Sequence, residues 1–88
     1  MKIKDGYMLK TVAGSNIVVP VGTAELTFRG MMTLNEVGTV VWKALEEDTT
    51  VEKIADKIVS EYNVDLGTAT RDVKIFIDKL REKNMIDD

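Results

Sequence analysis

The chain contains neither cysteine nor histidine. Disulfides, zinc fingers, thiol nucleophiles and histidine-dependent acid-base chemistry are therefore excluded together, which removes the usual machinery of most enzyme classes. Long hydrophobic runs are also missing. No window approaches the roughly 18 apolar residues of a spanning helix, and the first six residues contain no apolar core of a secretory signal. We therefore expect a cytoplasmic protein that makes no use of a membrane.

An excess of positive charge is absent as well. The 88 residues include 12 Lys and Arg against 15 Asp and Glu, a formal net charge of −3. Affinity for nucleic acid comes largely from neutralising phosphates, so this balance disfavours nonspecific DNA or RNA binding. The length corresponds to one small domain with few residues to spare from packing. Function should therefore reside on the surface, in a groove or at a sheet edge.

The first third of the chain has the pattern of β-strands. Two β-prone runs, Tyr7–Val12 and residues 16–19, flank a short turn at residues 13–15 and predict a hairpin. Pro20, the single proline, should lie at the end of the second strand or on an unpaired side, because it lacks an N–H for the ladder. Residues 28–34 predict a third, short strand. All three strands precede any helix.

Helical periodicity begins after Asn35, which is a suitable N-cap for a helix over residues 36–46. Gly38 inside that helix predicts that another group packs closely against this turn, and Trp42 is expected in the core. A second helix follows, with Thr49 predicted as its cap. Its apolar stripe consists of Ile54, Ala55, Ile58, Val59 and Tyr62.

A third helix is predicted over residues 66–83, with Asp65 or Thr68 as its cap. Four apolar residues should form its core stripe, with Ile77 at the edge: Ala69, Val73, Phe76 and Leu80. Ile75 falls nearly opposite, on a face of charged neighbours, and is expected to be exposed. Met85 and Ile86 should pack back on the core after a cap at Asn84.

The order of these elements predicts an α+β fold. It is a three-stranded antiparallel sheet followed by three helices, similar to a winged helix-turn-helix. No repeat or linker interrupts it.

The residues give little basis for catalysis. No glycine-rich phosphate loop is present, and the acidic runs at residues 46–48 and 87–88 lack the ligand spacing of a metal site. A serine or threonine nucleophile would have no histidine as its base. We expect a protein that is not an enzyme and has no cofactor or metal.

A winged helix-turn-helix raises DNA binding as an alternative function, with the third helix as the recognition helix. That helix carries five basic residues against three acidic ones: Arg71, Lys74, Lys79, Arg81 and Lys83 against Asp72, Asp78 and Glu82. Its start offers no Arg or Asn cluster for bidentate base contacts. Nucleic acid is therefore not the expected partner.

The third strand offers a different function. If it lies at the sheet edge, the backbone from Gly30 to Leu34 is an open template for an added strand. Met31 and Met32 would adapt to varied apolar guests, although one core and one surface methionine would explain them equally well. A third alternative is a structural domain that dimerises through the same edge.

Three segments together resemble the PqqD family. They are Leu-Asn-Glu-Val-Gly-Thr-Val-Val-Trp at residues 34–42, the capped second helix, and Asp-Val-x-x-Phe-Ile-x-x-Leu at residues 72–80. The resemblance runs from about residue 7 to residue 86. Asn84-Met85-Ile86 stands where the family typically has a Gly-Leu-Leu-like segment.

The resemblance implies that residues 1–88 form a single peptide-recognition domain. PqqD-like domains bind the leader of a ribosomally made precursor peptide and present it to a modifying enzyme, often a radical S-adenosylmethionine enzyme. The leader adds to the third strand, against the third helix. Carried over to this chain, the implied peptide-binding residues are Arg29, Gly30, Met31, Met32, Thr33 and Leu34 on the strand, with Arg71, Lys74, Ile75 and Asp78 on the helix.

We therefore expect a noncatalytic peptide chaperone, a recognition element for ribosomally synthesised, modified peptides. The pathway would be pyrroloquinoline quinone biosynthesis or a related one. A homodimer is a further possibility that the sequence leaves open.

Overall fold

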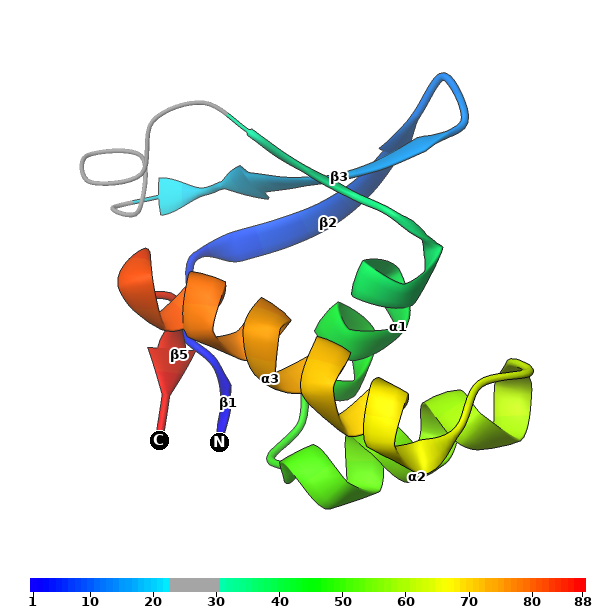
Figure 1. Cartoon of the computed structure of the whole chain (residues 1–88). Coiled ribbons are helices and arrows are strands. Elements are labelled where there is room, and N and C mark those ends of the chain that lie inside the picture. Colours follow the sequence, from blue (N-terminus) through cyan, green and yellow to red (C-terminus); the bar gives the residue numbers. More distant parts are fainter. Residues whose placement is uncertain (23–30) are drawn as a thin grey trace.

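A computed structural model describes residues 1–22 and 31–88 of the chain. Strands occupy the start of the chain and helices follow (Figure 1). In chain order the elements are β1 (Lys2–Ile3), β2 (Tyr7–Val12), β3 (Ser15–Pro20), β4 (Met32–Leu34), α1 (Glu36–Ala44), α2 (Val51–Glu61), α3 (Leu66–Glu82) and β5 (Ile86–Asp87).

The main sheet is antiparallel with the order β2-β3-β4, as predicted. Val12 pairs with Ser15, so the hairpin turns on two residues. Ala13 and Gly14 both have positive φ, 52° and 80°, which is the backbone that a tight hairpin needs. Pro20 is the last residue of β3, as expected. The described part of the predicted third strand is β4, and residues 28–30 lie outside the described residues.

The helices pack around a single apolar cluster that also includes Val18 of β3 and Leu34 of β4. Trp42 is 1% exposed, which confirms its predicted place in the core. The Tyr7 ring meets the Trp42 ring edge to face, with centroids 6.5 Å apart at 87°, a favourable arrangement of aromatic quadrupoles. This pair joins the sheet to α1.

The cap of α1 is Asn35, whose side-chain oxygen accepts from the Gly38 N–H at 2.7 Å. The cap of α2 is Thr50, which accepts from the Lys53 N–H; the prediction of Thr49 was wrong by one residue. The Thr49 backbone pairs with Met1 instead, its N–H donating to the Met1 carbonyl at 2.9 Å. Because that bond ties the Thr49 backbone to Met1, the residue before β1, Thr49 stays outside the helix, which begins at Val51.

The cap of α3 is Asp65. Its buried face consists of Ala69, Val73, Ile77 and Leu80. The prediction that Phe76 lies in this stripe and Ile77 at its edge was wrong, because Ile77 is 1% exposed and Phe76 is only partly buried. The reason is tertiary: α3 packs mainly against α2, and the Phe76 side chain lies on the flank that faces α1.

The end of α3 is closed by a Schellman motif. Asn84 has a φ of 58°, and its N–H donates to the Arg81 carbonyl. The Met85 N–H reaches back to the Leu80 carbonyl at 2.9 Å, which completes the motif. Met85 is fully buried, as the sequence predicts.

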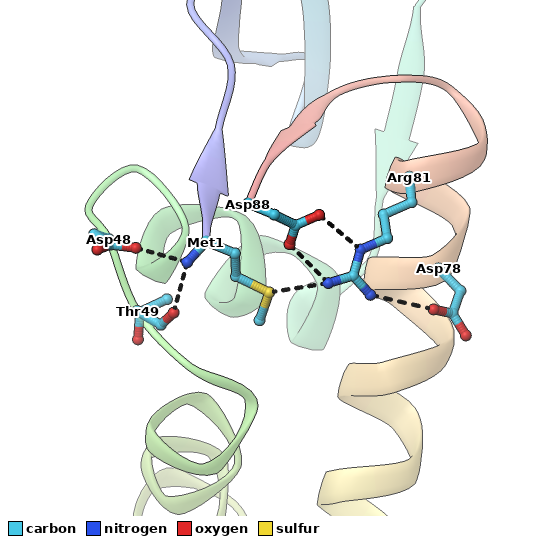
Figure 2. Close-up of polar contacts among 6 residues, drawn as sticks. All are labelled: Met1, Asp48, Thr49, Asp78, Arg81 and Asp88. Atoms are coloured by element: carbon cyan, nitrogen blue, oxygen red, sulfur yellow. Dashed lines mark hydrogen bonds and ion pairs between the residues drawn. The ribbon is translucent and has the colours of Figure 1, made fainter.

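A second, two-stranded sheet pairs β1 with β5, and the two ends of the chain lie side by side (Figure 1). Figure 2 shows the polar contacts around it: the Met1 ammonium meets the Asp48 carboxylate at 2.6 Å, and Arg81 donates to Asp88 at 2.8 Å and lies 3.7 Å from Asp78. The acidic partner of each ion pair is exposed to solvent, so these pairs contribute little to the free energy of unfolding. The sequence did not predict this sheet, because two-residue strands carry no periodicity.

In the part of the chain that the structure describes, no helix has the length and apolar content needed to cross a bilayer.

The position of the α2 cap is testable with a matched pair of variants. Thr50→Ala should lower the free energy of unfolding by about 1 kcal/mol, because it leaves the Lys53 N–H without its acceptor. Thr49→Ala keeps the Met1 backbone bonds and should cost much less. Urea denaturation of both variants measures the difference. A larger loss for Thr49→Ala would contradict the cap assigned to Thr50.

The Asp65 cap predicts a pH effect on stability. The hydrogen bonds from the Thr68 hydroxyl and the Thr68 N–H lower the pKa of Asp65 below its ordinary value of 3.8. A depressed folded pKa contributes stability above the unfolded pKa, and that stability is lost as pH falls through the folded pKa. Asp65→Asn keeps a capping oxygen that does not titrate. The wild type's advantage over Asp65→Asn in urea denaturation should be constant above about pH 5 and shrink below about pH 4; an advantage that grows toward acid would refute this.

Candidate functional site

A groove follows the flank of α3 that faces β4 and α1. It consists of two pockets that share Asn35, Phe76 and Lys79. The pocket between α1 and α3, here the α1–α3 pocket, holds about 360 Å³ and is lined by Asn35, Val37, Gly38, Val41, Asp72, Ile75, Phe76 and Lys79. The pocket between β4 and α3, the β4–α3 pocket, holds about 290 Å³ and is lined by Met32, Thr33, Leu34, Asn35, Phe76, Lys79, Leu80 and Lys83.

The two pockets meet where Phe76 lies on Gly38. A Cβ on Gly38 would be 3.1 Å from the Phe76 ring carbon Cε2 and 3.1 Å from the Asn35 Oδ1 atom. Both contacts are tighter than ordinary van der Waals distance, so the ring approaches the α1 backbone through the space that a side chain would fill. This is the close approach that the sequence predicts at Gly38. It sets the separation of α1 and α3 at the centre of the groove.

Helical spacing determines which α3 residues reach the groove. Asp72, Ile75, Lys79 and Lys83 line it at three- or four-residue steps along one flank. Phe76 and Leu80, four residues apart, line it beside them. Ile75 is 50% exposed, as expected from its charged neighbours. The exposed Ile75 side chain therefore forms part of the wall of a groove and does not lie on a flat surface.

The opposite wall is the edge strand β4. Its partner is β3, with Thr33 opposite Ile17 and Met32 opposite Val18. Because β4 is last in the strand order, no strand of the described residues pairs with its outer side. Thr33 is exposed, whereas Met32 packs partly against the core and Leu34 is buried. The backbone of this wall is thus available to an added strand.

The residues predicted as a peptide site fall into three groups. Met32, Thr33, Leu34 and Ile75 line the groove, and Met31, 64% exposed, directly precedes β4. Three others on α3 line neither pocket; these are Arg71, Lys74 and Asp78. Two lie outside the described residues, Arg29 and Gly30.

Sequence reasoning missed several lining residues: Asn35, the cap of α1; Val37, Gly38 and Val41 on α1; Asp72, Phe76, Lys79 and Leu80 on α3; and Lys83, the C-cap of α3. Periodicity placed Ile75 among charged neighbours on both of its flanks, and only the packing of α3 selects the flank of Asp72 and Lys79. For the α1 wall of the groove, the sequence offered one indication: Gly38, which predicts that another group packs closely against the first turn of that helix.

Among the residues that the structure describes, no group of three or more acidic side chains is placed to hold a metal ion. The groove is lined instead by apolar side chains, backbone and a few charges. Such a surface is suited to binding an extended chain.

Adjacent isoleucines on α3 test this orientation of the helix. Ile77→Ala should cost about 2 to 5 kcal/mol of unfolding free energy, because Ile77 is buried in the core. Ile75→Ala should change it by no more than about 0.5 kcal/mol, because Ile75 faces the groove. Urea denaturation of both variants gives the comparison, and equal losses would place the groove on the wrong flank of α3.

Comparison with known proteins places the chain in a family. Among solved structures it is similar to "TbiB1 in Complex with the TbiA(beta) Leader Peptide", with 30% identity, a TM-score of 0.76, and coverage of 97% of this chain and 93% of that chain. It also shares the fold of "Lasso peptide synthetase B1 complexed with the leader peptide", at 17% identity and a TM-score of 0.75, with coverage of 96% and 93%. A search of curated proteins found no match. The family described as coenzyme PQQ synthesis protein D matches residues 17–86, and the chain therefore belongs to the PqqD family.

Proposed function

We propose that this protein is a noncatalytic adaptor that binds the leader segment of a ribosomally made precursor peptide by strand addition to β4. The observation that carries the proposal is the open edge of β4, which forms one wall of a groove whose other wall is α3. Membership of the PqqD family supports it, as does the 30% identity to TbiB1, whose structure holds a leader peptide.

Strand addition divides the work between backbone and side chains. Hydrogen bonds from the β4 backbone give affinity that is independent of the peptide's sequence. Alternate side chains of the peptide then enter the groove, where Phe76 and Ile75 offer apolar contacts. The two methionines that precede Thr33 adapt to different guests. We propose that Arg29 and Gly30 also contact the leader, and that Arg71, Lys74 and Asp78 contact the parts of the leader outside the groove.

The adaptor acts by raising effective concentration. Holding the leader keeps the rest of the precursor near the active site of a separate modifying enzyme. We propose a radical S-adenosylmethionine enzyme as that partner, in pyrroloquinoline quinone biosynthesis or a related peptide-modification pathway in the cytoplasm. In this proposal residues 1–88 act as one recognition domain that requires neither a cofactor nor a nucleic acid; a second copy is an additional candidate partner.

Two substitutions at one position test the strand addition. Thr33→Pro removes a β4 N–H and disturbs the strand, whereas Thr33→Val keeps the N–H and favours an extended backbone. The tagged wild type and both variants are used to capture partners from native cell lysate, with peptides and proteins identified by mass spectrometry. The wild type and Thr33→Val should retain a short peptide and its modifying enzyme, and Thr33→Pro should lose both.

Circular dichroism first establishes that Thr33→Pro retains its helices. The captured peptide is then synthesised with single N-methyl groups, which remove its N–H donors one at a time without altering the protein. Losses of affinity that recur at every second position indicate an added strand. Uniform tolerance of N-methylation, or capture of DNA whose binding falls steeply with salt, would overturn the proposal.

A further inference from the structure

We propose that the groove selects peptides in which an acidic residue lies two or four positions from a large apolar residue. The acidic side chain faces Lys79 or Lys83, and the apolar side chain enters the α1–α3 pocket; this arrangement is here called the charge order. This inference rests on the proposed function and adds the class of peptide that the groove accepts. It comes from three independent features of the groove, namely its charges, its spacing and its apolar end.

The charges of the groove are divided between its ends. Lys83 lines the pocket beside β4, Lys79 lines both pockets, and Asp72 lines only the α1–α3 pocket. One end is therefore basic, in a chain whose formal net charge is −3. A local field opposed to the overall charge favours an acidic partner at that end and rejects a basic one.

The two lysines have no carboxylate partner among residues 1–22 and 31–88. Arg81, on the same part of α3, is engaged with Asp78 and Asp88. Cations near the end of a helix also interact favourably with its dipole, and Lys79 lies in the last turn of α3 together with Arg81. That interaction does not depend on the flank of the helix from which the cation projects. The helix dipole therefore does not explain why two lysines without a carboxylate partner both lie on the flank that faces the groove.

The spacing along α3 matches that of an added strand. One turn of α3 advances about 5 to 6 Å, and two strand residues advance about 6.6 Å. Peptide side chains that face the groove, at every second position, thus meet successive turns of α3. Lys83, Lys79 and Ile75 follow one another at intervals of one turn. The peptide residue that faces Ile75 is therefore two positions from the peptide residue that faces Lys79 and four positions from the one that faces Lys83.

The apolar end can accept a large side chain. The α1–α3 pocket holds about 360 Å³, within the range of small-ligand sites. Its walls include Val37, Val41 and the half-exposed Ile75, with the Phe76 ring at its boundary with the β4–α3 pocket. Asp72 at this end disfavours a second acidic residue in the peptide there. The groove accordingly distinguishes the two ends of a peptide that lies along it.

A displayed library of random 12-residue peptides tests the proposal. It is selected against the wild type, against the double variant Lys79→Glu with Lys83→Glu, and against Lys53→Glu with Lys57→Glu as the matched control. Lys53 and Lys57 are exposed on α2, one helical turn apart, and line neither pocket. The wild type and the α2 control should enrich peptides with an acidic residue two or four positions from a large apolar residue. The double variant should enrich a basic residue at the same distance.

Synthetic versions of the selected peptides then separate charge from folding. Replacing the acidic residue of a wild-type peptide with lysine should weaken binding about tenfold by fluorescence polarisation, and the double variant should restore it. Such a restoration requires a folded groove. Enriched peptides without this charge order, or affinity unchanged by the replacement, would overturn the inference while leaving the proposed function intact. A library in which no peptide is enriched would overturn both.

Discussion

The groove depends on the contact between the Phe76 ring and the backbone at Gly38. The ring lies 3.1 Å from the place of an absent Cβ, so even an alanine at this position would require the ring or the Asn35 side chain to move. Phe76 lines both pockets, and Gly38 lines the α1–α3 pocket. This contact therefore sets the width of the groove. It also explains why a glycine that costs about 1 kcal/mol in helix propensity lies within the first turn of α1.

The open edge of β4 forms the wall of the groove opposite α3. An open edge is a hazard for a small protein, because it invites pairing with any extended chain. Here β4 is only three residues long, and it runs beside α3, so a strand added to it must also fit the side chains of the groove. In the proposed mode of binding, the backbone of β4 supplies general affinity, and the charged and apolar ends of the groove restrict which chain is accepted.

The ends of the chain hold the α3 wall in place. The Schellman motif directs Met85 into the core, and β5 then pairs with β1. The β1 segment is in turn bonded to the helical part, since the Ile3 N–H donates to the Leu45 carbonyl at 2.8 Å. The C-terminal half of α3, which carries Lys79 and Lys83, is thereby fixed from both sides. A binding wall on a packed helix loses less entropy on binding than a mobile loop would.

The sequence by itself determined the elements whose causes are local. The Ala13-Gly14 turn, the Asn35 cap, the burial of Trp42 and the exposure of Ile75 follow from backbone preference, capping chemistry and periodicity. For the third helix the sequence offered Asp65 or Thr68 as the cap, and the structure has Asp65. Only the tertiary structure decided features that require two distant segments. Met1 shifted the α2 cap from Thr49 to Thr50, and α2 drew Ile77 rather than Phe76 into the core. Periodicity ranks the faces of a helix by polarity but does not reveal which element packs against each face. Lys79 and Lys83 lie in the groove because α1 and β4 pack beside their flank of the helix, and that packing is a property of the tertiary structure alone.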